Sequence, residues 1–212
     1  LLMVTLRHPE TAPEFLDRFL VTCEAYKVPA TILLSKSDLQ DPGELAAFRA
    51  VYEGAGYPVL TVSAATGEGM EAVGELLQGR TTLVSGNSGV GKSTLVGTID
   101  PTLDIRTGEL SESHGKGRHT TTFSTMYPLA GGGAVIDTPG IKGFGLIDIG
   151  EGELWHYFPE MMRTGRDCRF YNCTHTHEPG CAVTEAVMRG EIAPMRYESY
   201  LKMLDDDDKY RK

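Results

Sequence analysis

The segment from Gly86 to Ser93 reads GNSGVGKS and matches the pattern G-x-x-x-x-G-K-[ST] at every fixed position. Its glycines let successive backbone N–H groups turn inward and form a nest for an anion. Lys92 would place a positive charge on the outer phosphates of a nucleoside triphosphate, and the Ser93 hydroxyl would ligate Mg²⁺. Because a strand pattern precedes the segment and a helical pattern follows it, we expect a nucleotide-binding loop with contacts from Gly86, Asn87, Ser88, Gly89, Val90, Gly91, Lys92, Ser93 and Thr94.

A second phosphate-sensing motif, Asp137-Thr138-Pro139-Gly140, follows an apolar strand pattern downstream of this loop. In such a motif the aspartate reaches Mg²⁺ through water, and the glycine N–H meets the γ-phosphate. The polar, glycine-rich segment 107–122 lies between the two motifs, and its threonines are candidates for a switch that closes over the magnesium. An ordinary exposed loop is the alternative interpretation of that segment.

The residue after Gly140 is Ile141, where many GTPases carry a glutamine that orients the attacking water. An isoleucine side chain can neither donate nor accept a hydrogen bond. Hydrolysis therefore requires another group to position the water. His119 in the switch-like segment is the nearest candidate with useful proton chemistry.

Two strand patterns upstream end in residues that suit a pocket for a guanine base. Ser35-Lys36-Ser37-Asp38 resembles the motif N-K-x-D, in which the aspartate accepts from guanine N1–H and the exocyclic amine while the lysine stem covers the base. Ser35 is shorter than the asparagine it replaces, which leaves an ATPase with relaxed base choice as an alternative. Ser63-Ala64, at the end of the next strand pattern, would bring a backbone N–H to guanine O6.

Three of the four cysteines lie between residues 168 and 181, in the arrangement Cys168-(x4)-Cys173-x-His175-(x5)-Cys181. Three thiolates and one imidazole suit a tetrahedral Zn²⁺ ion with every position filled by protein, so the predicted metal is structural. His177 is a rival ligand that the spacing does not exclude. A disulfide would leave an odd thiol in the cluster and suits the cytosol poorly. Cys23 lies on a helical apolar stripe and is predicted to belong to the core.

The motifs occur in an unusual order, because the base-reading segments precede the phosphate loop. We expect an α/β chain with the P-loop NTPase three-layer fold and a mostly parallel sheet, circularly permuted, followed by a small α-helical zinc-binding domain. The expected domains are 1–150 and 151–212. Strand patterns cover 1–6, 29–34, 57–62, 80–85, 123–129 and 133–136; helical patterns cover 14–26, 44–54, 70–77, 154–162, 182–190 and 191–204, and another opens at Ser93.

Composition narrows the classes of function further. The 212 residues are 41% hydrophobic, which suffices for a real core, and the net charge of −9 argues against a broad nucleic-acid-coating surface while leaving room for a local basic patch. No run of 18 apolar residues occurs, so we expect no membrane span. The sequence starts inside a strand-like segment, and we expect residues upstream of it.

The permuted order, GNSGVGKS, GKGRHTTT, DTPG and the cysteine–histidine spacing together resemble the RsgA (YjeQ) family of circularly permuted bacterial GTPases, over essentially the whole chain. The resemblance implies an N-terminal OB-fold, absent from this chain, before the GTPase domain and the zinc-binding domain. It implies that Lys92 and Ser93 hold phosphates and Mg²⁺, that Thr121 is the switch threonine, and that Asp137 and Gly140 sense the γ-phosphate. By the same resemblance Lys36 and Asp38 read guanine, His119 is the catalytic candidate, and the zinc ligands are Cys168, Cys173, His175 and Cys181.

The resemblance also implies a biological role, in which GTP hydrolysis is stimulated by the 30S ribosomal subunit and linked to release from it during late maturation. The expected ligands are GTP or GDP, Mg²⁺ and one structural Zn²⁺ ion. The expected partners are the 30S subunit and its 16S rRNA, and the chain is expected to be a cytoplasmic monomer. Ile141 suggests the alternative of a nucleotide-gated binding module with negligible hydrolysis.

Overall fold

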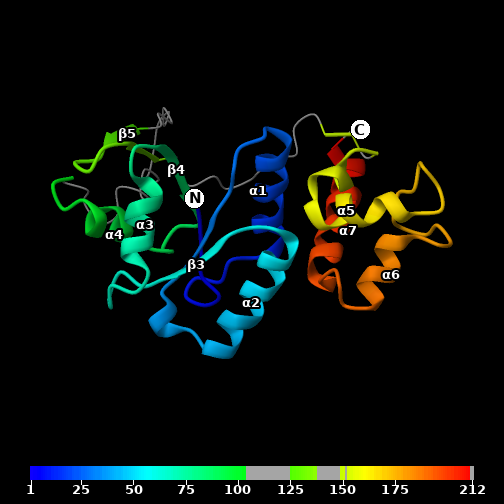
Figure 1. Ribbon diagram of the computed structural model, residues 1–212, viewed down its shortest axis with the longest axis horizontal. Helices are drawn as coiled ribbons and strands as arrows, with labels where there is room; N and C mark the ends of the chain where they lie inside the picture. The colour runs from blue at the N-terminus through cyan, green and yellow to red at the C-terminus, as the bar shows by residue number, and fades with distance from the viewer. Residues whose placement is uncertain (104–124, 138–148, 151, 211–212) are drawn as a thin grey trace. The chain divides into compact units, whose positions relative to one another are not determined.

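The computed structural model of the chain describes residues 1–103, 125–137, 149–150 and 152–210 (Figure 1). These residues group into two compact units. The first comprises the described residues of Leu1–Thr11, Thr31–Phe48 and Pro58–Lys142, and the second those of Ala12–Ala30, Arg49–Tyr57 and Gly143–Lys212. The predicted domain boundary at residue 150 stays a prediction.

The first unit contains a six-stranded sheet with the strand order β3-β2-β1-β4-β6-β5. Neighbouring strands are parallel except at one edge, where β5 runs antiparallel to β6. A mostly parallel sheet with this motif order confirms the predicted fold class. The strands are β1 (Leu2–Val4), β2 (Ile32–Ser35), β3 (Val59–Val62), β4 (Thr81–Gly86), β5 (Thr125–Pro128) and β6 (Ala134–Asp137).

The central strands form because their sequences are continuous apolar runs. Ile32, Leu33 and Leu34 of β2 are completely buried, as are Leu2 and Met3 of β1. Parallel strands that are covered on both faces show such runs in place of alternation. Sequence pattern and burial therefore agree for the strands that carry the predicted site.

Two helices of the first unit pack together against the sheet, α3 (Met70–Leu77) and α4 (Lys92–Ile99). Val73 and Leu77 of α3 and Leu95 and Val96 of α4 form one apolar cluster with strand residues such as Val84. The short 3₁₀ helix η1 (Ser37–Leu39) follows β2, and α2 (Pro42–Ala55) begins in this unit and ends in the second.

The second unit is helical. Its helices are α1 (Pro13–Ala25), η2 (Leu154–Tyr157), α5 (Pro159–Thr164), η3 (Gly165–Asp167), α6 (Ala182–Met188) and α7 (Pro194–Tyr210). A single apolar cluster joins these helices and includes Val21 of α1, Phe158, Met161 of α5, Val183 of α6 and Tyr200 of α7. Helix α1, which precedes most of the sheet in the sequence, thus shares a core with the C-terminal helices.

Proline explains two of the helix boundaries that differ from the sequence-based prediction. The helix expected over 154–162 is divided into η2 and α5, with Pro159 at the start of α5. The last helix begins at Pro194 and not at Glu191. Proline lacks an N–H and favours the first helical turn, so each proline begins a helix in place of continuing one.

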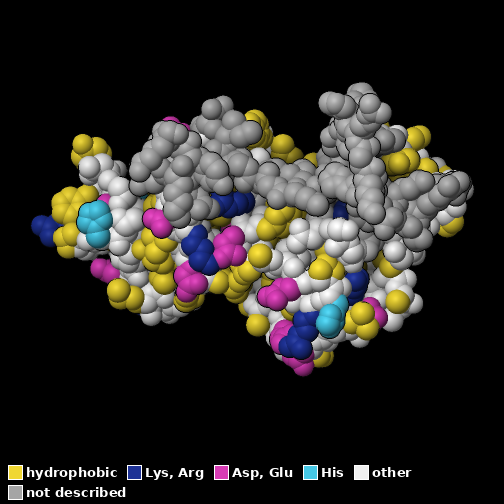
Figure 2. Space-filling model, turned by 180° about the vertical axis from the view of Figure 1, so that it is seen from behind, with side chains coloured by type: hydrophobic (Ala, Val, Ile, Leu, Met, Phe, Trp, Pro, Cys, Tyr) yellow, Lys and Arg dark blue, Asp and Glu magenta, His cyan; other side chains and the backbone are white. Residues whose placement is uncertain are grey.

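None of the helices in the described part of the chain is long and apolar enough to cross a membrane. On the face drawn in Figure 2, lysine and arginine side chains lie interspersed with aspartate and glutamate side chains.

Candidate functional site

The predicted nucleotide-binding segments meet at one edge of the sheet in the first unit. Strands β1, β2, β3, β4 and β6 are mutually parallel, so their carboxyl ends share an edge. Ser35, Val62, Gly86 and Asp137 end four of these strands. Segments far apart in the sequence are therefore brought to the side of the sheet where ligands bind in such folds.

The phosphate loop owes its shape to three glycines. Gly86, Gly89 and Gly91 have φ angles of 146°, 84° and 102°, which side chains rarely permit. A Cβ atom on Gly86 would lie 2.3 Å from the carbonyl oxygen of Met3 on the neighbouring strand. Glycine at this position is thus required both by the backbone angle and by the close approach of β1.

Lys92 is the first residue of α4, and its ammonium group is buried within the loop. Nζ donates to the carbonyl oxygens of Gly86 at 2.7 Å and Asn87 at 2.9 Å. The side chain of Val90 is buried in the apolar cluster, which leaves only its backbone to face a ligand. The adjacent Ser93 is half-buried, whereas Ser88 and Thr94 are exposed.

The two base-reading segments are joined by a hydrogen bond between their predicted residues. The Ser63 hydroxyl, at the end of β3, donates to Oδ1 of Asp38, after β2, at 2.5 Å. Lys36 has a left-handed φ of 57°, and its Nζ donates to the carbonyl oxygen of His8 at 2.7 Å. Ser35 is buried, with its Oγ 3.6 Å from where a Cβ of Gly91 would lie, so this segment abuts the phosphate loop. Ala64 follows Ser63 and is half-buried.

Ser37 and Glu68, two residues without a predicted role, tie the same two loops together. Ser37 Oγ donates to Glu68 Oε2 at 2.6 Å, and the carbonyl of Glu68 accepts from the backbone N–H of Ser63 at 3.0 Å. A glutamate between two glycines matches no known motif, so the sequence alone does not predict its bond with Ser37.

Three predicted residues, His119, Thr121 and Gly140, lie outside the described residues. Asp137 is the last residue of β6, and its backbone pairs with Val84 of β4, the strand that leads into the phosphate loop. Roles for these four residues stay predictions.

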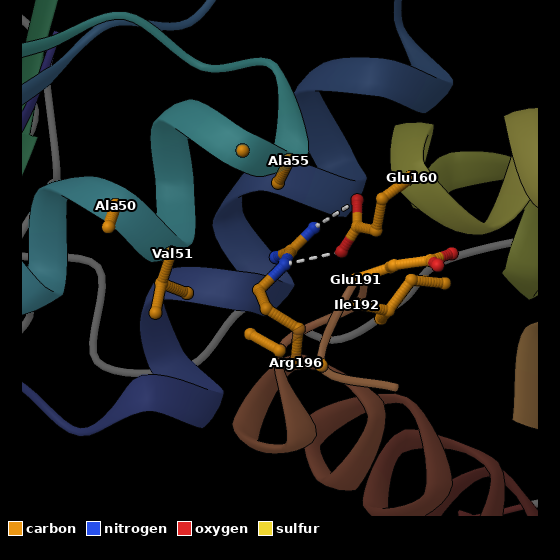
Figure 3. Close-up of a pocket in the computed structure, with 10 residues that line it drawn as sticks. Ala50, Val51, Ala55, Glu160, Glu191, Ile192 and Arg196 are labelled. Atoms are coloured by element: carbon orange, nitrogen blue, oxygen red, sulfur yellow. Dashed lines mark hydrogen bonds and ion pairs between the residues drawn. The ribbon is translucent and has the colours of Figure 1, made fainter. Parts of the chain in front are cut away.

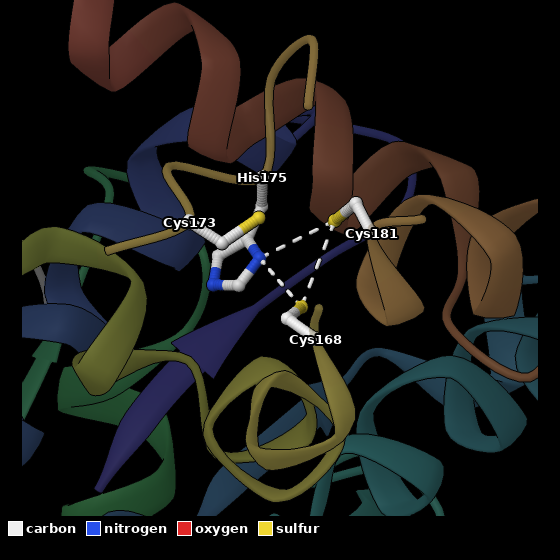
Figure 4. Close-up of side chains that lie close together, drawn as sticks. All are labelled: Cys168, Cys173, His175 and Cys181. Carbon is white, nitrogen blue, oxygen red and sulfur yellow. Dashed lines mark hydrogen bonds between the residues drawn. The ribbon is translucent and has the colours of Figure 1, made fainter. Parts of the chain in front are cut away.

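The second unit brings Cys168, Cys173, His175 and Cys181 together, with one ligand atom of each lying within 4.8 Å of the others (Figure 4). Nδ1 of His175 is 3.5 Å from Sγ of Cys168 and 3.4 Å from Sγ of Cys181, and these two sulfur atoms are 3.9 Å apart. The cysteines are free thiols, which leaves no disulfide among them. The rival His177 is exposed, and its Nδ1 contacts the Thr176 hydroxyl.

These separations fit a tetrahedral ion. With Zn–S near 2.3 Å and Zn–N near 2.0 Å, the edges of a ligand tetrahedron are about 3.5–3.8 Å long. The donor set of thiols and one imidazole nitrogen is that of closed structural zinc sites. The chemistry and the spacing of the residues present thus suit zinc, with Nδ1 as the histidine donor.

Surrounding groups hold the loop that carries His175. The hydroxyls of Tyr197 and Tyr200 on α7 donate to the carbonyl oxygens of His175 and Thr174, each at 2.6 Å. The Trp155 ring packs edge-on against the imidazole, with centroids 4.6 Å apart. A Cβ on Gly165 would lie 2.9 Å from the Trp155 ring and 3.2 Å from His175, so a larger residue there would force these rings to shift. Tyr197 and Tyr200 therefore pack with the helical core and also hold the loop of the cluster in place.

Cys23 is half-buried on α1 and lies outside the metal-type cluster. Burial raises the pKa of its thiol to about 11, so the thiol stays protonated near neutrality.

Comparisons with known proteins agree with this geometry. The family model described as "RsgA GTPase" matches residues 1–147. The chain is 52% identical to the small ribosomal subunit biogenesis GTPase RsgA of Bacteroides fragilis, covering 100% of this chain and 70% of that protein. It is 52% identical to the protein of the same name from Porphyromonas gingivalis, with coverage of 99% and 69%.

Solved structures are similar as well. YjeQ from Thermotoga maritima superposes with a TM-score of 0.79 at 37% identity, covering 97% of this chain and 69% of that one. YloQ, a circularly permuted GTPase, superposes with a TM-score of 0.77 at 29% identity, covering 100% of this chain and 68% of that one. With a matching family model, relatives at half identity over its full length and the permuted strand order, the chain belongs to the RsgA GTPase family.

Proposed function

We propose that this chain is a GTP-hydrolysing assembly factor that binds the 30S ribosomal subunit and acts late in its maturation. Hydrolysis would be stimulated by the subunit and linked to release. The observation that carries the proposal is the meeting of the phosphate loop with the Lys36–Asp38 and Ser63–Ala64 segments at one sheet edge, in a chain of this family. The names of its relatives give the process in which it would act.

In this proposal the phosphates lie on the backbone N–H groups of residues 86–94 and against the ammonium of Lys92. The hydrogen bonds from Lys92 to Gly86 and Asn87 keep its charge at the loop, where an anion can replace the two carbonyl groups as the acceptor. Ser93, Thr121 and Asp137 would hold Mg²⁺, which when bound neutralises charge developing on the phosphates. The Gly140 N–H would meet the γ-phosphate.

The base would be read by Asp38, covered by the stem of Lys36 and met by the backbone N–H of Ala64. Ser63 supports this role because its hydroxyl fixes one carboxylate oxygen of Asp38. The Ser35 hydroxyl would donate one hydrogen bond, but its side chain is too short to span the distance that an asparagine amide spans. His119 would orient the attacking water, since Ile141 has no polar atom.

One zinc ion would be held by Cys168, Cys173, His175 and Cys181. The ion would have a structural role, because four protein ligands leave no position for a reacting water. The chain itself would act as a cytoplasmic monomer, with the 16S rRNA of the 30S subunit as part of its binding surface.

The decisive test measures GTP hydrolysis with and without purified 30S subunits, beside GDP binding by the same preparation. We expect slow intrinsic turnover and a large increase on adding subunits. His119→Ala should keep GDP binding and lose the stimulated turnover, whereas Lys92→Ala should lose binding. Intact binding without any stimulation would favour a nucleotide-gated module and defeat the proposed enzyme.

A further inference from the structure

The loops that follow β2 and β3 are joined by a closed ring of hydrogen bonds. Glu68 Oε2 accepts from Ser37 Oγ at 2.6 Å, and the Glu68 carbonyl accepts from the Ser63 backbone N–H at 3.0 Å. Ser63 Oγ in turn donates to Asp38 Oδ1 at 2.5 Å, and Asp38 follows Ser37 in the chain. The ring therefore fixes both the backbone before Asp38 and the carboxylate itself.

Glu68 has little freedom to leave this arrangement. Gly67 N–H donates to the Ser63 carbonyl at 2.9 Å, which closes the turn in front of Glu68. Gly69 has a φ of 70°, and a Cβ there would lie 2.3 Å from the Thr61 carbonyl oxygen, so the backbone behind Glu68 is pressed against β3. Ser37 is only 6% exposed, and Ser63 is completely buried. Glu68 is exposed, but its carboxylate is bonded to the buried Ser37 and its backbone carbonyl to the buried Ser63.

We propose that Glu68 is a positioning residue for base recognition, which holds the Asp38 segment against the Ser63–Ala64 segment. The inference rests on the proposed role of Asp38 as the guanine reader. Ser35 is shorter than the asparagine that stands at this position of the N-K-x-D motif. The Glu68–Ser37 bond, formed by a carboxylate that accepts from a hydroxyl, supplies a restraint between the same loops.

The test compares GDP with inosine diphosphate, which lacks the exocyclic amine from which Asp38 would accept a hydrogen bond. Affinities are measured by displacement of a fluorescent GDP analogue from the purified chain. We expect Glu68→Ala to lower the affinity for GDP about tenfold, which is the scale of one hydrogen bond to a charged group. The affinity for inosine diphosphate should fall less, so the ratio of the GDP affinity to the inosine diphosphate affinity falls. Glu68→Gln retains an acceptor oxygen and should stay close to the unchanged protein.

Three further variants sharpen the result. Ser37→Ala should reproduce the effect of Glu68→Ala, and the double variant should add little to either, since both remove one bond. Glu71→Ala removes an exposed carboxylate from the first turn of α3 and serves as the matched control, with no change in the ratio. A thermal unfolding curve for each variant accompanies the binding data.

The possible failures are distinguishable. If Glu68→Ala weakens both nucleotides equally and lowers the melting temperature, its role is merely structural and the inference is overturned. If Asp38→Asn shifts preference towards xanthosine diphosphate while Glu68→Ala leaves the ratio unchanged, the inference alone fails. If Asp38→Asn changes no base preference, the proposed guanine pocket fails, and the inference with it.

Discussion

The two units of the molecule satisfy their buried charges in different ways. In the first unit, Lys92 donates to backbone carbonyls of the phosphate loop, and Asp100 accepts from the backbone N–H groups of Thr102 and Ala130 as well as from the Thr102 hydroxyl. In the second unit, Arg196 lies between two carboxylates and donates to Asp17 at 2.6 Å. It also donates to Glu160 at 2.8 Å, and Figure 3 shows this pair. Backbone groups are among the partners of Lys92 and Asp100 in the first unit, whereas opposite side-chain charges flank Arg196 in the second.

The difference matches what each unit has to do. The Lys92 ammonium donates to two neutral carbonyl groups, and it can redirect these hydrogen bonds to an arriving phosphate. Arg196 is 1% exposed and stacked near the rings of Tyr52, Tyr57 and Phe158, so its charge is committed permanently. Burial lowers the pKa of Arg196, but the negative charges of Asp17 and Glu160 together raise it by more, so the net shift is upward. The first arrangement suits a ligand site, and the second a fixed scaffold.

The largest expected effect concerns the metal-type cluster of Cys168, Cys173, His175 and Cys181. Removing zinc with a chelator, or changing Cys173→Ser, should lower the stability of the chain by several kcal/mol, because structural zinc contributes directly to folding. Zinc content by elemental analysis and thermal unfolding would measure this. Cys23→Ser is the control, since Cys23 lies outside the cluster, and should keep one equivalent of zinc. A Cys173→Ser chain that still holds a full equivalent would contradict the ligand assignment.

Next in size is the buried ion cluster. Arg196→Met should destabilise the chain by about 3–5 kcal/mol, because it leaves two carboxylates buried without their partner. Chemical denaturation measures the loss. Lys202→Met lies on the same helix and removes an exposed ion pair with Glu14, so it should leave the denaturation midpoint unchanged. Equal denaturation midpoints for Arg196→Met and Lys202→Met would show that the buried charges of the second unit do not stabilise it as a fixed scaffold.

A smaller effect is expected where the backbone itself shapes the site. Gly86→Ala should cost about 1–3 kcal/mol from the backbone angle alone and more from the clash with Met3, and it should abolish GDP binding. Gly97→Ala is the matched control inside α4, where nothing lies within 4 Å, and should stabilise by about 0.5–1 kcal/mol. Binding by calorimetry and denaturation together measure both outcomes. Undiminished GDP binding by Gly86→Ala would show that the loop does not depend on this angle.

The smallest effect is a pH dependence in the first unit. Hydrogen bonds from the Ala130 backbone and the Thr102 hydroxyl lower the pKa of Asp100 below its ordinary value of 3.8. Its stabilising contribution is therefore complete above about pH 4 and is lost as the pH falls through the folded-state pKa. The difference in urea midpoint between the unchanged chain and Asp100→Asn should be constant near neutrality and shrink below pH 4. A difference that grows with acid would reverse the assigned sign.

Sequence patterns predicted the parts of the site that depend on local geometry. The phosphate loop, the strand ends and the cysteine–histidine cluster were found because glycine, β-branched runs and ligand spacing act over a few residues. The Asp17–Glu160–Arg196 cluster was not found, since its members lie on α1, α5 and α7 and no spacing links them. The Ser37–Glu68 bond was missed for the same reason. Charged and hydroxyl side chains that pair over long sequence distances produce no periodic pattern in a single sequence.

The position of β4 has a consequence for how the protein is made. This strand leads into the phosphate loop, and it lies between β1, from the start of the sequence, and β6, which ends at Asp137. Pairings between such distant segments form late, because a long stretch of chain must first be ordered. The two strands that flank β4 are therefore both available only after residue 137 has been synthesised, so the sheet around the loop at residues 86–93 is completed after that point.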